Sequence, residues 1–167
     1  ESLATFDAVV MNNIHEPNPF VPEDIGALSK DEQKAAWERD AVVKMSLLEF
    51  VSRGKGIVGI HAATAALQGW QEYGEMMGGF YGGHMTTEAT MKNEEPDHSV
   101  NACFEGKPFA IFDEFYIMKA PYAREKLRVL LSLDLAKTQD PKKRKDNDYA
   151  ISWVKPVNLH QESLASM

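Results

Sequence analysis

The fold is decided by one stretch of the chain, Gly56-Ile57-Val58-Gly59-Ile60-His61-Ala62-Ala63-Thr64-Ala65. Its first five residues are apolar without alternation, which is typical of a parallel strand covered on both faces. His61 follows directly, and the residues after it are small. This pattern predicts a sharp strand-to-helix elbow that exposes His61 at the carboxyl end of the strand, where open α/β sheets bind ligands. A structural histidine bonded to a backbone carbonyl is the alternative.

A helix and a second strand precede this stretch. Ser29 and Glu32 have the spacing of a capping box, and Gly54 marks the end of the helix. Apolar residues between them recur at helical spacing: Trp37, Ala41, Met45, Leu48 and Val51. Residues 6–11, with the apolar run Ala8-Val9-Val10-Met11, predict a short buried strand that ends at Asn12 and Asn13. The order strand, helix, strand predicts an α/β fold with a parallel sheet.

The remaining chain predicts further short elements. We expect a second helix from Ala62 to Leu67, a helical turn from Tyr73 to Met77, a loop from Gly78 to His84, and strands at residues 86–91, 109–112, 128–133 and 149–154.

Composition excludes several classes of protein. The chain has 167 residues, with 25 acidic against 18 basic side chains and a net charge of -7. This balance argues against nucleic-acid binding, which needs a basic face. One cysteine, Cys103, allows neither an intrachain disulfide nor a multi-cysteine metal site, and we expect it to be a small buried side chain without catalytic use. No apolar run is long enough to span a membrane.

Two further positions carry groups suited to catalysis. His84 follows the pair Gly82-Gly83, whose backbone allows close approach of a ligand, and Asp113-Glu114 follows an apolar strand. We expect His61, His84 and the two acids to converge on one cleft at the carboxyl edge of the sheet. The alternatives are a plain tight turn at His84 and, for the acids, a loop residue and a helix cap.

Several motifs in the same order resemble the ThuA-like (trehalose utilisation) family. They are residues 6–13, residues 50–65 through His61, the Gly-Gly-His turn at 82–84, Asp113-Glu114-Phe115-Tyr116, residues 128–134 and Ser152-Trp153-Val154. The resemblance covers about residues 3–154 and is most specific around His61.

The resemblance implies a flavodoxin-like fold, a three-layer α/β sandwich with a mostly parallel sheet, as in class I glutamine amidotransferases. The elbow of those enzymes carries a cysteine nucleophile, and His61 stands at that position here, so amidotransferase activity is not expected. Family members usually begin with another strand and helix and end with a glycine-rich strand, which residues 156–160 do not match. We therefore expect residues 1–167 to form a single, partial ThuA-like domain, truncated at both ends.

The resemblance also implies a role in carbohydrate metabolism, on trehalose or related glucosides including 3-keto forms. His61 and His84 would carry protons, and Asp113 and Glu114 would hold sugar hydroxyls. Asn12, Asn13, Gly83 and Tyr116 are the expected substrate-binding residues. No particular cofactor is indicated, and a divalent metal held by His61 and His84 is left open.

The alternative is a non-catalytic sugar-binding or interaction domain on the same fold. A shallow cleft lined by Trp70, Tyr73 and Tyr81 would favour plain binding. Loss of a central strand would uncover Val9, Val10, Ile57 and Ile60, so the chain would be unstable or self-associate unless another segment filled the gap. The compartment is left open between the cytoplasm and, after removal of a signal peptide, the periplasm or the exterior.

Overall fold

The structure is a computed structural model that describes residues 3–138 and 144–156. Its contacts divide the chain into two compact units, residues 1–77 with 156–167 and residues 78–155. Each unit is described by itself, and the prediction of a single domain stays a prediction. The expected departure from the family beyond Pro156 lies outside the described residues. Within the described part, no helix is both long enough and apolar enough to cross a membrane.

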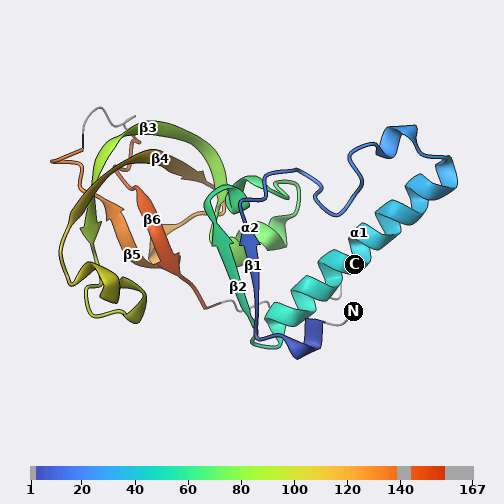
Figure 1. The fold of residues 1–167 in the computed structure, drawn as a ribbon, viewed down its shortest axis with the longest axis horizontal. Coiled ribbons are helices and arrows are strands. Elements are labelled where there is room, and N and C mark those ends of the chain that lie inside the picture. The colour runs from blue at the N-terminus through green and yellow to red at the C-terminus, as the bar shows by residue number, and fades with distance from the viewer. Residues whose placement is uncertain (1–2, 139–143, 157–167) are drawn as a thin grey trace. The chain divides into compact units, whose positions relative to one another are not determined.

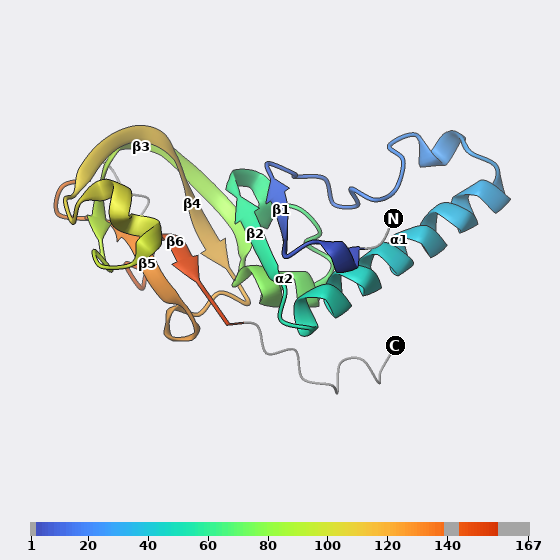
Figure 2. The ribbon, with the colours of Figure 1, turned by 60° about the horizontal axis from the view of Figure 1, so that its bottom comes forward.

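The first unit is built on a strand–helix–strand arrangement (Figures 1 and 2). Strands β1 (Ala8–Asn12) and β2 (Gly56–Ile60) pair in parallel, and helix α1 (Lys30–Ser52) connects them. Helix α2 (Gln71–Met77) contacts β2. The described residues of this unit also contain the 3₁₀ helices η1 (Leu3–Thr5), η2 (Ile25–Ala27) and η3 (His61–Ala65). The predicted strands and the long helix between them are confirmed, whereas the predicted second helix is only η3.

Helix α1 begins at the predicted capping box. The Ser29 hydroxyl accepts the Glu32 backbone N–H, and the Glu32 carboxylate accepts the Ser29 backbone N–H at 2.8 Å. These two bonds satisfy donors that the first helical turn leaves without partners. The buried apolar side chains lie in the last turns of the helix, at Leu47, Leu48, Phe50 and Val51, whereas the middle of the helix buries Asp40 and Trp37 near its start is 46% exposed. The apolar spacing thus predicted the helix correctly but overstated the length of its buried face.

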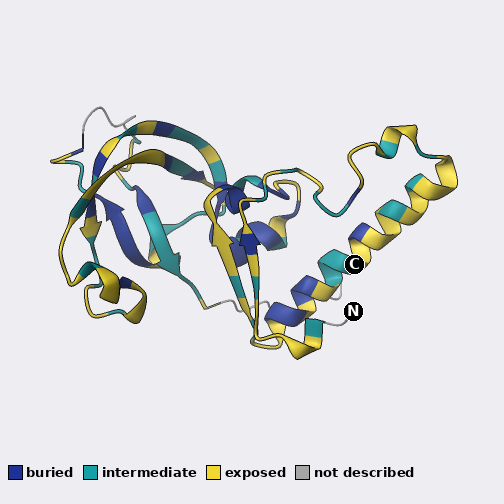
Figure 3. Cartoon of the chain, viewed as in Figure 1, coloured by how far each residue is buried: buried dark blue, intermediate teal, exposed yellow. Residues whose placement is uncertain are grey.

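The two faces of the β1–β2 pair differ in burial. Most residues of both strands are exposed, as Figure 3 shows. On one face Met11 is buried, and a Cβ at Gly59 would lie 2.7 Å from the Met77 sulfur of α2. On the other face Val10 and Ile60 are 56% and 46% exposed. Within the described residues of the first unit, the expectation of coverage on both faces is therefore wrong, because no element of that unit covers the second face. Of the four residues expected to be uncovered, Val10 and Ile60 are exposed, whereas Val9 and Ile57 are half-buried.

The second unit is an antiparallel sheet of strand order β4-β3-β5-β6 among its described residues. The strands are β3 (Phe80–Asn93), β4 (Phe109–Lys119), β5 (Arg128–Leu133) and β6 (Ala150–Val154). The 3₁₀ helices η4 (Ser99–Phe104) and η5 (Arg124–Lys126) lie in the connections. Its core contains Met85, Ala89, Met91, Phe115, Leu133 and Tyr149.

The mostly parallel, three-layer flavodoxin-like sheet predicted for the chain is not confirmed. In the described residues β1 and β2 are parallel, but all pairs among β3 to β6 are antiparallel. The buried run at residues 129–133 fits both arrangements, since a strand inside an antiparallel sheet is also buried when both of its faces are covered. A mixed α/β protein is what the described elements form.

A β-bulge lies where the sequence predicted a loop. Gly82 and Gly83 belong to β3, and the pairing shifts between Tyr81, opposite Met118, and His84, opposite Tyr116. The extra residue on β3 reverses the alternation of its side chains, so that Phe80 before the bulge and Met85 after it are both buried. Gly83 has φ of +141°, a conformation that favours glycine. The glycine pair therefore bends a strand rather than closing a turn.

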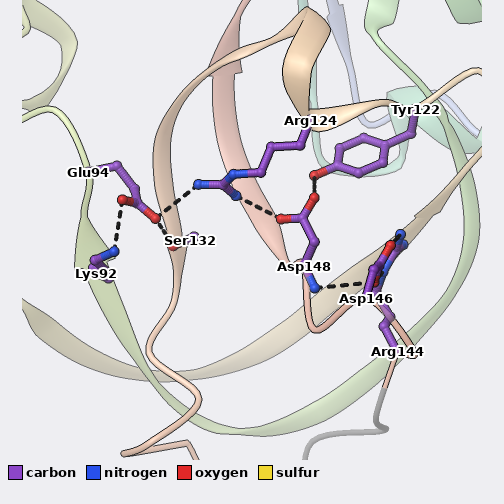
Figure 4. A network of polar contacts seen from close by, with 8 residues as sticks. All are labelled: Lys92, Glu94, Tyr122, Arg124, Ser132, Arg144, Asp146 and Asp148. Atoms are coloured by element: carbon purple, nitrogen blue, oxygen red, sulfur yellow. Dashed lines mark hydrogen bonds and ion pairs between the residues drawn. The ribbon is translucent and has the colours of Figure 1, made fainter.

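A network of charged side chains ties the connections of the second unit together (Figure 4). Arg124 donates to Glu94 at 3.0 Å and to Asp148 at 2.7 Å. Glu94 also accepts the Ser132 hydroxyl at 2.6 Å and pairs with Lys92 at 2.9 Å. Partial burial alone would raise the pKa of Glu94, but the Ser132 and Lys92 hydrogen bonds and the nearby positive charges outweigh it and lower that pKa.

The lowered pKa of Glu94 predicts acid sensitivity of the second unit. A carboxylate whose pKa is lower in the folded than in the unfolded chain stabilises the folded state at pH values above 4.5, its ordinary pKa. This stabilisation is lost as the pH falls through the lower pKa of the folded chain. We expect Glu94→Gln to lower the free energy of unfolding by about 2 kcal/mol at neutral pH and to flatten its decline below about pH 5. Urea unfolding across pH measures both effects.

Glu105→Gln is the matched control for this prediction. Glu105 pairs with Lys107 at 2.7 Å, but both side chains are 73% exposed, so removal of that pair is expected to cost less than about 0.5 kcal/mol. Equal effects of the two substitutions would contradict the role given to Glu94.

Candidate functional site

The elbow predicted after β2 is present at His61. This residue has φ of +53°, in the left-handed region, and it begins η3 directly after Ile60. Its side chain is exposed, whereas Ala62, Ala63 and Thr64 are buried beneath the turn. A left-handed conformation costs about 1–2 kcal/mol for a residue with a side chain, and such outliers cluster at functional sites. The backbone thus holds the imidazole outward at the carboxyl end of a parallel strand.

Asn13 is brought to His61 by the pairing of the two strands. The last ladder pair joins Asn12 and Ile60, so the next residues, Asn13 and His61, lie side by side. Asn13 also adopts a left-handed φ of +56°, and its backbone N–H donates to the Ile60 carbonyl at 3.1 Å. Its side-chain Oδ1 lies 2.7 Å from Nδ1 of His61. Asn12 is exposed at the end of β1, and its predicted contact with substrate stays a prediction.

A second cluster forms beside the bulge, on the β3–β4 pair. Tyr116 lies opposite His84 in the ladder, and Glu114 comes two residues earlier on the same strand. The Tyr81 hydroxyl lies 2.7 Å from Nδ1 of His84, and Oε1 of Glu114 lies 3.9 Å from its Nε2. The Tyr81 and Tyr116 rings meet edge to face with centroids 4.7 Å apart. His84 and Glu114 are each 40% exposed, so the cluster opens to solvent.

Tyr116 keeps its hydroxyl proton in this cluster. Burial is the main reason that its pKa is raised, and the neighbouring Glu114, Tyr81 and Asp113 add to the effect. A neutral phenol can both donate and accept a hydrogen bond. Tyr116 is therefore suited to bind an uncharged ligand rich in hydroxyl groups.

Asp113 does not join Glu114 in the cluster. The two acids lie within β4, opposite Thr87 and Thr86, rather than at the strand end that the sequence suggested. Successive residues of a strand point to opposite faces, so Glu114 shares a face with Tyr116 and Asp113 does not. Oδ1 of Asp113 accepts the backbone N–H of Glu114 at 2.8 Å.

The other aromatic residues considered for a binding cleft are part of the core. Trp70 is 8% exposed and Tyr73 is fully buried, and their rings stack with centroids 6.0 Å apart. The Tyr73 hydroxyl donates to the Ala63 carbonyl at 2.8 Å, directly beneath the elbow. The sequence could not separate these roles, because aromatic residues with a polar tip suit both a core and a binding surface. Tyr81 is the one of the three that lies in a candidate site.

Cys103 is exposed, contrary to the prediction of a buried side chain. It lies in η4, whose short helical turn is buried only at Asn101, and its thiol contacts the Val100 carbonyl at 3.8 Å. Apolar neighbours in the sequence suggested burial, but one turn of helix on the surface buries only the residue that points inward. Cys103 has no position at a strand end comparable to that of His61.

The predicted site residues thus form two clusters, one in each unit. His61 and Asn13 belong to the first unit, and His84, Glu114 and Tyr116 belong to the second. The convergence of the two histidines on one cleft stays a prediction. Among the described residues, no group of three or more histidine, cysteine, aspartate or glutamate side chains is arranged to hold a metal ion. A metal shared by His61 and His84 therefore also stays a prediction.

The fold and the elbow define a mixed α/β protein with an outward-facing histidine at the end of a parallel strand. The model of the ThuA family, described as trehalose utilisation, matches residues 1–162, and the chain belongs to this family. A crystal structure of a protein described as ThuA-like, from Bacteroides uniformis, is similar in fold with a TM-score of 0.54 and 19% identity. The similarity covers 90% of this chain and 56% of that protein's chain. A search of curated proteins found no match.

Substitution of His61 tests whether its side chain stabilises the fold or is available to bind a ligand. Because the imidazole is exposed, we expect His61→Ala to change the free energy of unfolding by less than about 1 kcal/mol. His61→Gly should be at least as stable as His61→Ala, since glycine adopts the left-handed backbone without strain. Thermal and urea unfolding measure both variants. A loss of several kcal/mol in both would support a structural histidine instead.

Proposed function

We propose that this chain is a carbohydrate-processing domain that acts on trehalose or related glucosides, including 3-keto forms. The observation that carries the proposal is the exposed, left-handed His61 in a chain of the trehalose-utilisation family. Membership of the family supports a role in carbohydrate metabolism in general. The substrate, the reaction and the residues named below are the proposed part.

The proposed chemistry is acid–base catalysis by two histidines. An imidazole can accept and donate a proton near neutral pH, which suits a reaction that moves protons between sugar hydroxyl or carbonyl groups. In this proposal His61 takes a proton from one position of the sugar. His84 exchanges a proton with the sugar at a second position. Glu114, 3.9 Å from Nε2 of His84, would hold a hydroxyl group or stabilise the protonated imidazole.

The aromatic pair beside His84 would bind the sugar ring. Tyr81 and Tyr116 each offer an apolar ring face and a hydroxyl tip, which matches a sugar with C–H groups on its faces and hydroxyls on its rim. Gly83 supports this proposal, because a Cβ at that position would have no atom within 4 Å, which leaves space above the strand for a ligand.

We also propose that the complete fold contains a flavodoxin-like sheet. The parallel β1–α1–β2 arrangement supports this proposal.

Turnover by matched variants tests the proposal. Purified chain is incubated with trehalose and with its 3-keto derivative, and products are followed by chromatography. His61→Gln and His84→Gln are each expected to lower turnover about 100-fold, which is the loss typical of a general acid or base. Lys34→Gln on the exposed surface of α1 is the control. Ammonia release from glutamine should stay at background in every sample, because His61 offers no thiolate.

Two outcomes would contradict the proposal. Full turnover in both histidine variants would show that neither carries protons. Saturable binding of the sugars by the wild-type chain without any turnover would instead support the alternative function, a sugar-binding or interaction domain.

One observation favours the interaction alternative. Val10 and Val58 lie opposite each other in the ladder, on the same face as Ile60, and all three are 45–56% exposed. Exposed apolar side chains gathered on one face of a sheet are typical of surfaces that bind other proteins. We propose a second copy of this chain as the partner.

Self-association can be measured by light scattering during size-exclusion chromatography. We expect the wild-type mass to rise with concentration and the double variant Val10→Thr, Val58→Thr to remain monomeric. Val42→Thr is the matched control, since Val42 is 64% exposed but lies on α1. A wild-type chain that stays monomeric at every concentration would contradict the proposed partner.

A further inference from the structure

Two separate bonds join Asn13 to the end of β2. The backbone N–H of Asn13 donates to the Ile60 carbonyl at 3.1 Å, and any residue except proline could make this bond. The second bond joins Oδ1 of Asn13 to Nδ1 of His61 at 2.7 Å and needs the asparagine side chain. Since the backbone bond already connects the two strand ends, the side-chain bond has a different effect, which is to orient the imidazole.

The chemistry of the two atoms decides where the imidazole carries its proton. A carboxamide oxygen is only an acceptor, so the nitrogen 2.7 Å from it must be the donor. A neutral imidazole carries one proton, and with that proton on Nδ1 the lone pair lies on Nε2. We propose that Asn13 is a positioning residue that fixes His61 in the Nδ1–H tautomer and so makes Nε2 its proton-accepting atom. The catalytic consequence rests on the proposed function.

Asparagine is better suited to this role than aspartate. Both residues tolerate the left-handed backbone found at position 13. A carboxylate would favour the positively charged imidazolium, whereas the neutral amide oxygen fixes the tautomer without adding a charge. The amide therefore favours an imidazole that is ready to accept a proton. In this proposal Asn13 acts on His61, and its predicted contact with the substrate stays a prediction.

The hydrogen-bond partner of His84 is a hydroxyl group, unlike the amide oxygen that contacts His61. Nδ1 of His84 lies 2.7 Å from the Tyr81 hydroxyl, which can either donate or accept. A hydroxyl therefore fits both tautomers of His84, whereas the amide oxygen of Asn13 fits only one tautomer of His61. This difference matches a division of work in which His61 accepts a proton and His84 can exchange one in either direction.

Nitrogen NMR reads the tautomer directly. The full chain is labelled with ¹⁵N-histidine, and two-bond ¹H–¹⁵N correlations are recorded at about pH 8, where an ordinary histidine is neutral. The chain has five histidines, so His61→Gln identifies the signals of His61. We expect the Nδ1–H pattern in the wild type and in Asn13→Asp, which keeps an acceptor. Asn13→Gly keeps the left-handed backbone but should shift His61 towards a mixture of tautomers.

Asn12→Ala is the matched control, because it removes a neighbouring amide that has no such contact with His61 in the described part of the chain. The His61 pattern should not change in this variant. An Nε2–H pattern in the wild type, or an unchanged pattern in Asn13→Gly, would overturn the proposal.

Kinetic measurements separate this proposal from the proposed function. If sugar turnover is found, Asn13→Gly should lower kcat about 10-fold or more with KM nearly unchanged. If the wild type has no turnover, the proposed function fails while the tautomer result still decides the role of Asn13.

Discussion

The candidate site depends on the parallel register between β1 and β2. Five residue pairs, from Ala8 with Gly56 to Asn12 with Ile60, align the two strands so that both end at the same level. A shift by one residue would separate Asn13 from His61 and would turn the side chains of one strand to the other face. Beneath the strand, Gly59 leaves room for the Met77 side chain of α2, because a Cβ at this position would lie 2.7 Å from the Met77 sulfur. The position of one imidazole is thus a property of the whole strand pair.

In the second unit, an antiparallel sheet with a bulge positions the other histidine, His84. The pair Gly82-Gly83 inserts an extra residue into β3, which places His84 opposite Tyr116 on the outer face while Met85 turns into the core. Bulges commonly redirect a side chain at the cost of local pairing. The charged network around Arg124 and Glu94 holds the connections of this sheet, so its stability and its surface cluster are maintained by different residues.

Local signals in the sequence predicted the first unit well. The capping box at Ser29, the apolar strand before His61 and the small residues after it each specify a local conformation, and the structure contains all of them. The second unit was predicted less well, because the direction of a strand depends on which distant strand it joins. Nothing within the run Arg128–Leu133 distinguishes a parallel from an antiparallel neighbour. The pairing of His61 with Asn13 was missed for the same reason, since it depends on register.

The left-handed turn at His61 exposes a side chain that can be replaced without a change in the fold. Ala62 and Ala63 fill the space beneath the turn, and the side chain at position 61 adds little to the packing. Asparagine, aspartate and glycine adopt the same backbone readily. A single codon change could therefore replace the reactive group at this position without redesign of the sheet, so that one scaffold could diversify between a proton acceptor, an acid and an inert binding surface.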